Sequence, residues 1–371
     1  MTKRILQIGM TSNIGGIETY LFRQFKYLDK NRLIFDFIQT YGEGEYPFTK
    51  EVQAMGGRVY RSPTRHATPL RYYLFWIKFW LARHREYHGV VVNTGGLYGS
   101  LFPLVLAYLC NIRKRVVFSH NAMDSIKPGM FNIILRRMNK FVLDHFANTY
   151  FACGKAAGKI LFGAKTYTVI NVCVEADHFK FDENKRRKIR CQLNLGSKLV
   201  IGHVGRFNKQ KNQTFLVEVM NELKNKGVDA ILLLIGGHDL PEDMDFYTRV
   251  ESMIQSLRLQ STVKILGKRD DVAELMMAMD VFVLPSLYEG FPGVGVEAQA
   301  TGLPCYFADT ITDEIAITPL AHFLPIDNPG KWADALSIVS INKQRDMQQM
   351  IQESGYDIET AISYIEDCYL S

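Results

Sequence analysis

Short apolar runs alternate with amphipathic segments along almost the whole chain. Such runs are typical of strands buried on both faces, and the segments between them place apolar residues at helical spacing. Strands are predicted at residues 5–10, 35–39, 58–61, 90–92, 116–118, 150–153 and 168–172, and again at 199–204, 230–235, 263–266 and 281–284. This alternation predicts an α/β fold with doubly wound parallel sheets.

The helices predicted between these strands differ in polarity. They cover residues 51–55, 71–85, 101–110, 130–146, 212–224, 248–257, 272–279 and 358–369. The helix at residues 71–85 is the most hydrophobic and carries Trp76 and Trp80 together with basic residues. Two interpretations stay open for it: an interfacial helix that dips into a membrane, or a helix packed on the sheet.

A chain of 371 residues is long enough for two domains. Residues 179–198 are charged and loosely patterned, and a second series of strands and helices begins at residue 199. We therefore predict one domain at residues 1–172 and another at residues 173–355. The densest basic run, Lys185–Arg190, falls in the loosely patterned segment and is expected to be a solvated part of a linker.

The stretch from Val281 to Pro304 combines a buried strand, a glycine-bearing loop and a helix. Backbone N–H groups and the positive end of the helix dipole meet at such a helix start, which makes it a site for a phosphate. Glu289 precedes the loop, and Glu297 is expected in the first turn of the helix. One carboxylate could hold a sugar and the other a ribose, with a diphosphate between them. The alternative is an ordinary strand–helix unit with two solvated glutamates.

A second anion site is predicted after the strand at residues 199–204, in the segment GRFNKQKN. Gly205 allows the turn. Arg206 and Lys211 can both reach one anion, arginine as a planar fork and lysine as a point charge. A coincidental surface pair is the alternative.

Two further candidates come from the first half of the chain. Gly15 and Gly16 lie between a strand and a helix, where glycine lets a backbone approach a ligand closely, although their spacing is not that of a dinucleotide fingerprint. His120 follows the strand at residues 116–118, and open α/β sheets bind ligands at the carboxyl ends of their strands. A histidine there could bond a sugar hydroxyl or a phosphate, or it could serve the structure alone.

Composition narrows the classes of function. The net charge of +6 suits acidic ligands or an anionic membrane, and no dense basic stripe with interleaved aromatics indicates nucleic-acid binding. The six cysteines lack C-x-x-C spacing, so neither a metal site nor a disulfide framework is expected. Unpaired cysteines fit a reducing compartment, so we expect a cytoplasmic location. No signal peptide is predicted. The uncharged stretch at residues 89–112 is interrupted by polar and glycine residues, so we interpret it as strand, loop and helix rather than a membrane span.

The segment EGFPGVGVE at residues 289–297 resembles the E-x7-E motif of retaining GT-B glycosyltransferases, specifically glycosyltransferase family 4. GRFNKQKN matches the G-R-x4-K-N motif of that family, and GGIE at residues 15–18 resembles its GG-x-E segment. The matches extend along nearly the whole chain in the same order. The chain is most similar to bacterial members that build capsular polysaccharides and exopolysaccharides.

The resemblance implies a GT-B fold, in which two Rossmann-like domains face each other across a cleft. A C-terminal helix at about residues 356–371 is expected to cross back to the N-terminal, acceptor-side domain. Catalytic roles are implied for His120, Arg206, Lys211 and Glu289. The implied donor-binding residues are Gly15, Gly16, Arg206, Lys211, Arg269, Glu289, Gly290, Phe291, Pro292, Gly293, Val294 and Glu297.

The implied reaction moves a hexose-type sugar from a nucleotide diphosphate, with a UDP-sugar favoured, to a glycan or a lipid-linked oligosaccharide. The family is assigned a front-face mechanism that retains the anomeric configuration and rests on positioning and charge stabilisation. No metal or other cofactor is expected. Lipid-linked acceptors and the basic, aromatic helix at residues 71–85 together predict peripheral contact with the anionic inner face of the cell membrane.

The chain departs from the family pattern in two places. Gly154 stands where relatives usually have serine, and Val172–Glu175 replaces the usual Asn-Gly-x-Asp turn. Two alternatives therefore stay open. One is a non-catalytic GT-B partner that only binds a sugar nucleotide, and the other is a GT-B sugar-nucleotide epimerase that uses acid–base groups.

Overall fold

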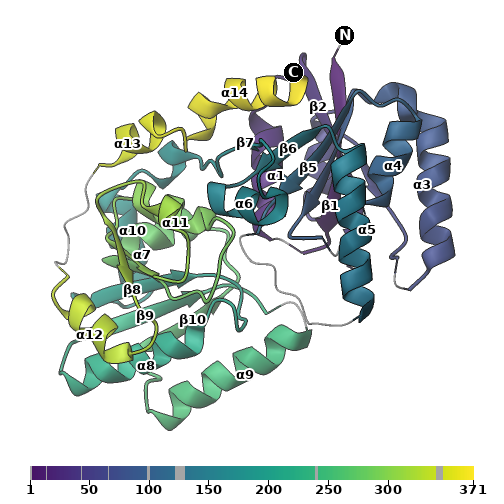
Figure 1. The fold of residues 1–371 in the computed structure, drawn as a ribbon. Coiled ribbons are helices and arrows are strands. Elements are labelled where there is room, and N and C mark those ends of the chain that lie inside the picture. The colour runs from purple at the N-terminus through teal and green to yellow at the C-terminus, as the bar shows by residue number, and fades with distance from the viewer. Residues whose placement is uncertain are drawn as a thin grey trace. The chain divides into compact units, whose positions relative to one another are not determined.

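Figure 1 shows the computed structural model, which describes residues 2–13, 15–42, 44–65, 67–97, 101–121, 130–238, 241–339 and 346–371. The chain divides into two compact units. Unit 1 holds Met1–Cys173 and Ile358–Ser371, and unit 2 holds Val174–Asp357. Each unit is built around its own parallel sheet, which confirms the prediction of two Rossmann-like α/β domains.

The sheet of unit 1 has the strand order β3-β2-β1-β4-β5-β6-β7, and its pairings are parallel. The order reverses between β1 and β4, and ligands of open α/β sheets bind at such a point, outside the carboxyl ends of the strands. The strands are β1 (Lys3–Thr11), β2 (Leu33–Tyr41), β3 (Val59–Arg61), β4 (Gly89–Thr94), β5 (Lys114–Ser119), β6 (Thr149–Ala152) and β7 (Thr168–Val169).

Helices pack on the sheet of unit 1, and the chain end joins them. The helices are α1 (Gly16–Tyr27), α2 (Thr49–Ala54), α3 (Pro69–Arg83), α4 (Phe102–Leu109), α5 (Met130–Phe146), α6 (Lys155–Phe162) and α14 (Ile358–Leu370). The C-terminal helix α14 belongs to unit 1, as the resemblance implied (Figure 1). Its Glu366 accepts hydrogen bonds from the backbone N–H of Asp29 and from Arg32, both at 2.5 Å. The hydroxyl of Tyr369 donates to Gln24 at 3.2 Å.

Helix α3 has one buried face and one exposed face. Trp76 and Trp80 are fully buried in the core of unit 1. The opposite face exposes Leu74 and Leu81, at 45% and 68% of their surface. One face of α3 therefore packs in the core of unit 1, and the opposite face is exposed.

Unit 2 repeats this architecture with the strand order β10-β9-β8-β11-β12-β13. Its strands are β8 (Leu199–Val204), β9 (Ala230–Ile235), β10 (Val263–Gly267), β11 (Val281–Leu284), β12 (Cys305–Ala308) and β13 (Ala321–Leu324). Its helices are α7 (Glu183–Gln192), α8 (Gln213–Asn225), α9 (Pro241–Ser256), α10 (Val272–Ala278), α11 (Gly293–Ala300), α12 (Pro329–Ser337) and α13 (Gln348–Glu353). The elements β12, β13, α12 and α13 were not predicted; the two strands contain no β-branched residue, unlike β11, which was predicted.

The basic run at residues 185–190 is not a solvated linker, contrary to the prediction. It lies in α7, whose N-cap Asp182 accepts hydrogen bonds from two backbone N–H groups of the first turn. Arg186 is buried, and its guanidinium lies 2.6 Å from the buried carboxylate of Asp280. Arg190 contacts the second oxygen of the same carboxylate at 3.2 Å. The prediction failed because a buried, paired arginine cannot be told from a solvated one in the sequence.

Candidate functional site

The loop between β8 and α8 carries both predicted phosphate ligands of unit 2. A Cβ at Gly205 would lie only 3.1 Å from Cδ of Lys211, so the stem of the lysine packs over the glycine. Arg206 is more exposed, and its Nε lies 3.5 Å from a carboxylate oxygen of Asp243 in α9. Asp243 is 2% exposed, and no motif indicated it, because it lies 37 residues further along the chain than Arg206.

Lys211 and Glu289 face each other across two loops of unit 2. Nζ of Lys211 lies 2.6 Å from Oε1 of Glu289, and the two side chains are 17% and 9% exposed. Gln210 donates to the backbone oxygen of Tyr288 at 2.9 Å and to Oε2 of Glu289 at 3.4 Å. The glutamate thus balances the charge of the lysine in this structure, and both groups are held at one place.

A second layer of polar groups supports the β8–α8 loop from behind. His203 is fully buried, with Nδ1 3.0 Å from the backbone oxygen of Val283 and Nε2 3.3 Å from Nε2 of Gln213. Gln213 also donates to the backbone oxygen of Arg206 at 3.0 Å. Burial lowers the pKa of His203 to about 4. His203 is therefore neutral and donates from Nδ1, and the sequence analysis missed both supporting residues because they lie in or beside regular elements.

The loop after β11 leads into the start of α11, as predicted. Pro292 occupies the N-cap position, and Gly293 and Val294 begin the helix. The backbone N–H groups of a first turn have no acceptor within the helix and can bind an anion. Glu297 is the fifth residue of α11, so it lies just beyond the first turn, which corrects the expected position. The helix starts earlier than expected because proline already holds a backbone angle suited to a helix start.

The loop that precedes α11 is packed against other residues of unit 2. Phe291 is 9% exposed, and its ring stacks on Tyr356 at a centroid distance of 5.4 Å. A Cβ at Gly295 would lie 3.0 Å from the ring of Phe307. Gly290 and Gly293 flank this packed segment. The main chain of the loop is thus fixed by the core of unit 2.

The glycine pair of unit 1 lies in the β1–α1 loop, where Glu18 organises the backbone. Oε1 of Glu18 accepts hydrogen bonds from the backbone N–H and the hydroxyl of Thr11, at 3.0 and 2.9 Å. A Cβ at Gly15 would lie 2.6 Å from the other oxygen of Glu18, whereas a Cβ at Gly16 would meet nothing within 4 Å. A side chain at Gly15 would therefore have to displace the carboxylate end of Glu18, and nothing opposes one at Gly16. Burial raises the pKa of Glu18.

His120 follows β5 and is oriented by Asn93 at the end of β4. The Asn93 side-chain nitrogen donates to Gln7 at 3.0 Å and to the backbone oxygen of Ile8 at 3.2 Å. This leaves Oδ1 of Asn93 as the acceptor 2.8 Å from Nε2 of His120. Nε2 of the histidine therefore carries the hydrogen and Nδ1 carries the lone pair. Burial lowers the pKa of His120 to about 3, so the ring is neutral at physiological pH.

The turn at Val172–Glu175, which departs from the family pattern, is anchored on both sides. Arg23 of α1 donates to the backbone oxygen of Cys173 at 2.8 Å. The backbone N–H of Val174 donates to the backbone oxygen of Tyr356 at 2.8 Å. Hydrogen bonds within each unit therefore hold the two ends of the turn. Gly154 is the N-cap of α6 and has an extended backbone.

The predicted site residues thus lie at the carboxyl edges of the two sheets. Unit 2 brings together Lys211 and Glu289, with Arg206 in the same loop as the lysine. Arg269 follows β10, and its guanidinium is paired with Asp271 at 2.6 Å. Among the residues that the structure describes, no cluster of three His, Cys, Asp or Glu side chains could hold a metal, and no helix is long and apolar enough to cross a membrane.

Similarity in three dimensions defines the fold. The structure of Anabaena Alr3699/HepE in complex with UDP-glucose superposes with a TM-score of 0.80 at 20% identity, covering 99% of both chains. The chain has the GT-B fold.

Sequence comparison finds similarity to glycosyltransferases. Residues 198–340 match the family described as glycosyl transferases group 1. The chain is 29% identical over 386 residues to the "Putative glycosyltransferase EpsF" of Bacillus subtilis (strain 168), covering 99% of this chain and 96% of that one. It is 35% identical over 104 residues to the UDP-Gal:alpha-D-GlcNAc-diphosphoundecaprenol alpha-1,3-galactosyltransferase of Escherichia coli, covering 28% and 26%. The chain therefore contains a region, residues 198–340, that matches the group 1 glycosyltransferases.

Proposed function

We propose that the chain is a retaining, metal-independent glycosyltransferase of family 4. It would move a hexose-type sugar, with UDP as the favoured carrier, to a glycan or lipid-linked oligosaccharide in the synthesis of a cell-surface polysaccharide. The observation that carries this proposal is the Lys211–Glu289 pair in the same unit as the glycine-rich start of α11. The relatives support the chemistry, since one is named for a UDP-sugar donor and a diphosphoundecaprenol-linked acceptor.

The donor diphosphate would bind the first-turn amides of α11 and the cations of the β8–α8 loop. Lys211 would then exchange Glu289 for a phosphate, and Arg206 would supply a second cation. In the transfer step, the bond from the sugar C1 to the diphosphate oxygen breaks while the acceptor oxygen bonds C1 on the same face. The acceptor proton passes to the leaving phosphate. Lys211 and Arg206 stabilise the charge that develops on the diphosphate.

His120 would hold the donor sugar rather than act as an acid. Its Nε2–H is already donated to Asn93, so Nδ1 is the atom left to accept a hydroxyl hydrogen. Its low pKa keeps that lone pair available throughout the physiological range. Asn93 is therefore a positioning residue for His120.

We also propose a cytoplasmic location with peripheral contact to an anionic membrane through the outer face of α3. That face exposes Leu70, Leu74, Ile77 and Leu81 next to Arg71 and Lys78, an arrangement typical of interfacial helices. Trp76 and Trp80 are buried and do not contribute. Salt-sensitive binding to anionic vesicles, lost in Leu74→Ser/Ile77→Ser, is the expected result. Equal binding to neutral and anionic vesicles at low salt contradicts the electrostatic part, and no binding contradicts the contact itself.

The experiment that tests the enzymatic proposal is incubation of the protein with UDP-sugars, with and without EDTA. Slow hydrolysis of the donor in the presence of EDTA is expected from a metal-independent glycosyltransferase. An epimerised UDP-sugar would instead identify an epimerase. UDP binding, seen as a raised melting temperature, without any turnover would identify a non-catalytic partner.

A further inference from the structure

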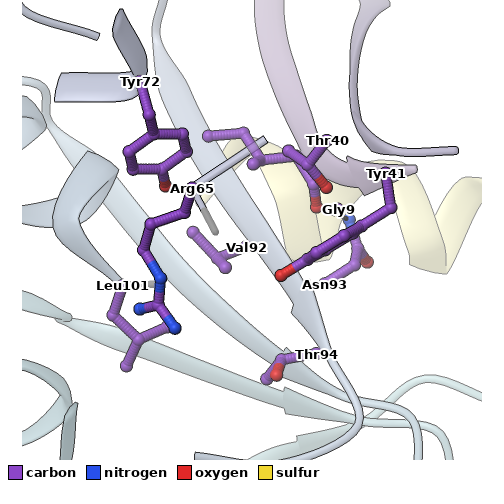
Figure 2. A pocket seen from close by; sticks show the side chains of 10 residues that line it. Gly9, Thr40, Tyr41, Arg65, Tyr72, Val92, Asn93, Thr94 and Leu101 are labelled. Atoms are coloured by element: carbon purple, nitrogen blue, oxygen red, sulfur yellow. Dashed lines mark hydrogen bonds between the residues drawn. The ribbon is translucent and has the colours of Figure 1, made fainter. Parts of the chain in front are cut away.

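The arginines at the carboxyl edges of the two sheets have different surroundings. Arg65 of unit 1 lines a small pocket with Tyr41 and Asn93, and Figure 2 shows Arg65 and Tyr41 extending from opposite sides of it. Arg206 of unit 2 lies in the β8–α8 loop, and its Nε is 3.5 Å from a carboxylate oxygen of Asp243. Asp243 is 2% exposed, whereas the side chain of Arg206 is 44% exposed. A proposed diphosphate ligand thus has a buried carboxylate beside it.

Helix α9 supports two consecutive residues of this loop. Asp243 and Tyr247 are four residues apart, so they lie on the same face of α9. Asp243 contacts Arg206, and the ring of Tyr247 packs edge-on against Phe207 with the centroids 5.1 Å apart. Phe207 is fully buried. The helix therefore holds the loop through a charge at one residue and through a ring at the next.

The main chain of the loop is also fixed by the end of β9. The backbone N–H of Phe207 donates to the backbone oxygen of Gly237 at 2.9 Å. A Cβ at Gly236 would lie 2.0 Å from the backbone oxygen of Gly205, so the two loops are in close contact. These contacts set the backbone at Arg206. The direction of its side chain depends on a contact of the guanidinium itself.

The contact between Arg206 and Asp243 differs in kind from the Lys211–Glu289 pair. Glu289 contacts the single nitrogen of Lys211 at 2.6 Å, so a phosphate would compete for the same atom. A guanidinium carries five N–H groups on three nitrogens, and Asp243 contacts its Nε side. The two terminal nitrogens form a fork that matches a phosphate. Arg206 can therefore bind Asp243 and a phosphate together.

We propose that Asp243 is a positioning residue for Arg206. Its buried carboxylate holds Nε and thereby directs the terminal nitrogens of the guanidinium toward the donor diphosphate. The same contact balances the charge of Asp243, since a carboxylate removed from water requires a cation or hydrogen-bond donors. This inference rests on the proposed glycosyltransferase function and adds to it a residue that acts on the donor through another side chain.

The first test neutralises Asp243 in the whole protein. Calorimetric titration with UDP compares Asp243→Asn, which keeps the size of the side chain, with Asp245→Asn, which neutralises an exposed carboxylate two residues further along α9. Asp243→Asn should weaken UDP binding by about three- to tenfold, a part of the loss expected when a charge-assisted bond is removed. Asp245→Asn should bind UDP as the wild type does. A carboxylate that only competed for Arg206 would give tighter binding when neutralised, so unchanged or tighter binding in Asp243→Asn contradicts the proposal.

A double-mutant cycle shows whether the effect passes through Arg206. Arg206→Gln should weaken UDP binding by about tenfold or more, and adding Asp243→Asn to it should cost no further affinity. Hydrolysis of the donor should follow the same pattern: Asp243→Asn should raise KM and lower kcat only while Arg206 is present, because the arginine is proposed to stabilise the leaving diphosphate. Equal losses in both backgrounds would mean that Asp243 supports the loop independently of Arg206, and would overturn the positioning role.

Arg206→Lys tests the same idea without a change inside α9. Lysine keeps the charge, but its single nitrogen cannot hold Asp243 on one side and present a planar fork to a phosphate on the other. This variant should therefore lose about as much UDP affinity as Arg206→Gln. Wild-type affinity in Arg206→Lys contradicts the proposal, even if Asp243→Asn does not fold.

UDP binding by the wild type separates this inference from the proposed function. A wild type that fails to bind UDP contradicts the proposed donor. Normal binding that Arg206→Gln weakens, with no coupling to Asp243, contradicts the positioning role alone.

Discussion

The ammonium of Lys211 lies 2.6 Å from a carboxylate oxygen of Glu289, 78 residues further along the chain. Both groups are largely shielded from water, so each holds the other in place and neutralises its charge. A diphosphate that bound Lys211, as proposed, would compete with Glu289. Such competition would couple donor binding to the position of the glutamate, and it shapes the first two predictions.

Lys211→Met should weaken UDP binding by about ten- to hundredfold, because a charge-assisted bond is worth about 1.5–3 kcal/mol. Lys209→Met is the matched control, since that lysine lies two residues earlier and is exposed. Calorimetric titration with UDP measures both variants. Wild-type affinity in Lys211→Met contradicts the assignment of the phosphate ligand.

Glu289→Gln should tighten UDP binding by a few-fold, because the amide no longer competes as an anion for Lys211. The same change should lower the rate of transfer, because the carboxylate is also proposed to face the sugar on which positive charge develops. A lower rate without weaker ground-state binding marks an interaction made mainly in the transition state. Weaker UDP binding in this variant would mean that the donor lies in the opposite direction.

Glu297→Gln should weaken UDP and the intact UDP-sugar alike, by about tenfold or more, because both contain the ribose that this carboxylate is proposed to bind. Inorganic pyrophosphate lacks ribose and serves as the control ligand. Its affinity should be the same for wild type and variant. A loss of pyrophosphate binding would show that Glu297 acts on the phosphate loop instead.

Asp280→Asn should destabilise unit 2 by about 3–5 kcal/mol, because it leaves the buried guanidinium of Arg186 without its carboxylate. Asp229→Asn removes the partner of Lys198 at an exposed site and should cost about 1 kcal/mol at most. Urea unfolding of the two variants measures the difference. Equal midpoints would restore the interpretation of α7 as a solvated segment.

Acid should destabilise the protein through its buried histidines. Burial lowers the pKa of His203 to about 4, so between its ordinary value of 6.5 and pH 4 the unfolded chain binds a proton that the folded chain does not. The contribution of neutral His203 to the free energy of unfolding is therefore complete at pH 7 and decreases as the pH falls below 6.5.

His203→Asn isolates this contribution, because asparagine can still donate to Val283 but cannot take up the proton. The variant should lose about 1.4 kcal/mol less per pH unit than the wild type between pH 6 and 5. Urea unfolding at a series of pH values measures the slopes. Parallel slopes would mean that His203 is not the group that titrates.

The long buried elements were predictable because local physics defines them. The boundaries of β8 and β9 were predicted to the residue, since each is an apolar run that a sheet can bury on both faces. The helix α5 was predicted with the same accuracy. The strands β12 and β13 were missed although β11, which also has four residues, was predicted, because β11 contains two β-branched valines and the other two strands contain none.

The sequence by itself determined the two α/β units and the positions of Arg206, Lys211 and Glu289 after their strands, because strand periodicity and loop glycines are local properties. It could not determine which charges pair. Only the tertiary structure brings Lys211 to Glu289 and buries Arg186 against Asp280, and only it places Arg65 and Tyr41 around one pocket with Asn93. The reason is physical: the energy of a charge depends on its burial and its partners, and both are set by segments far apart in the chain.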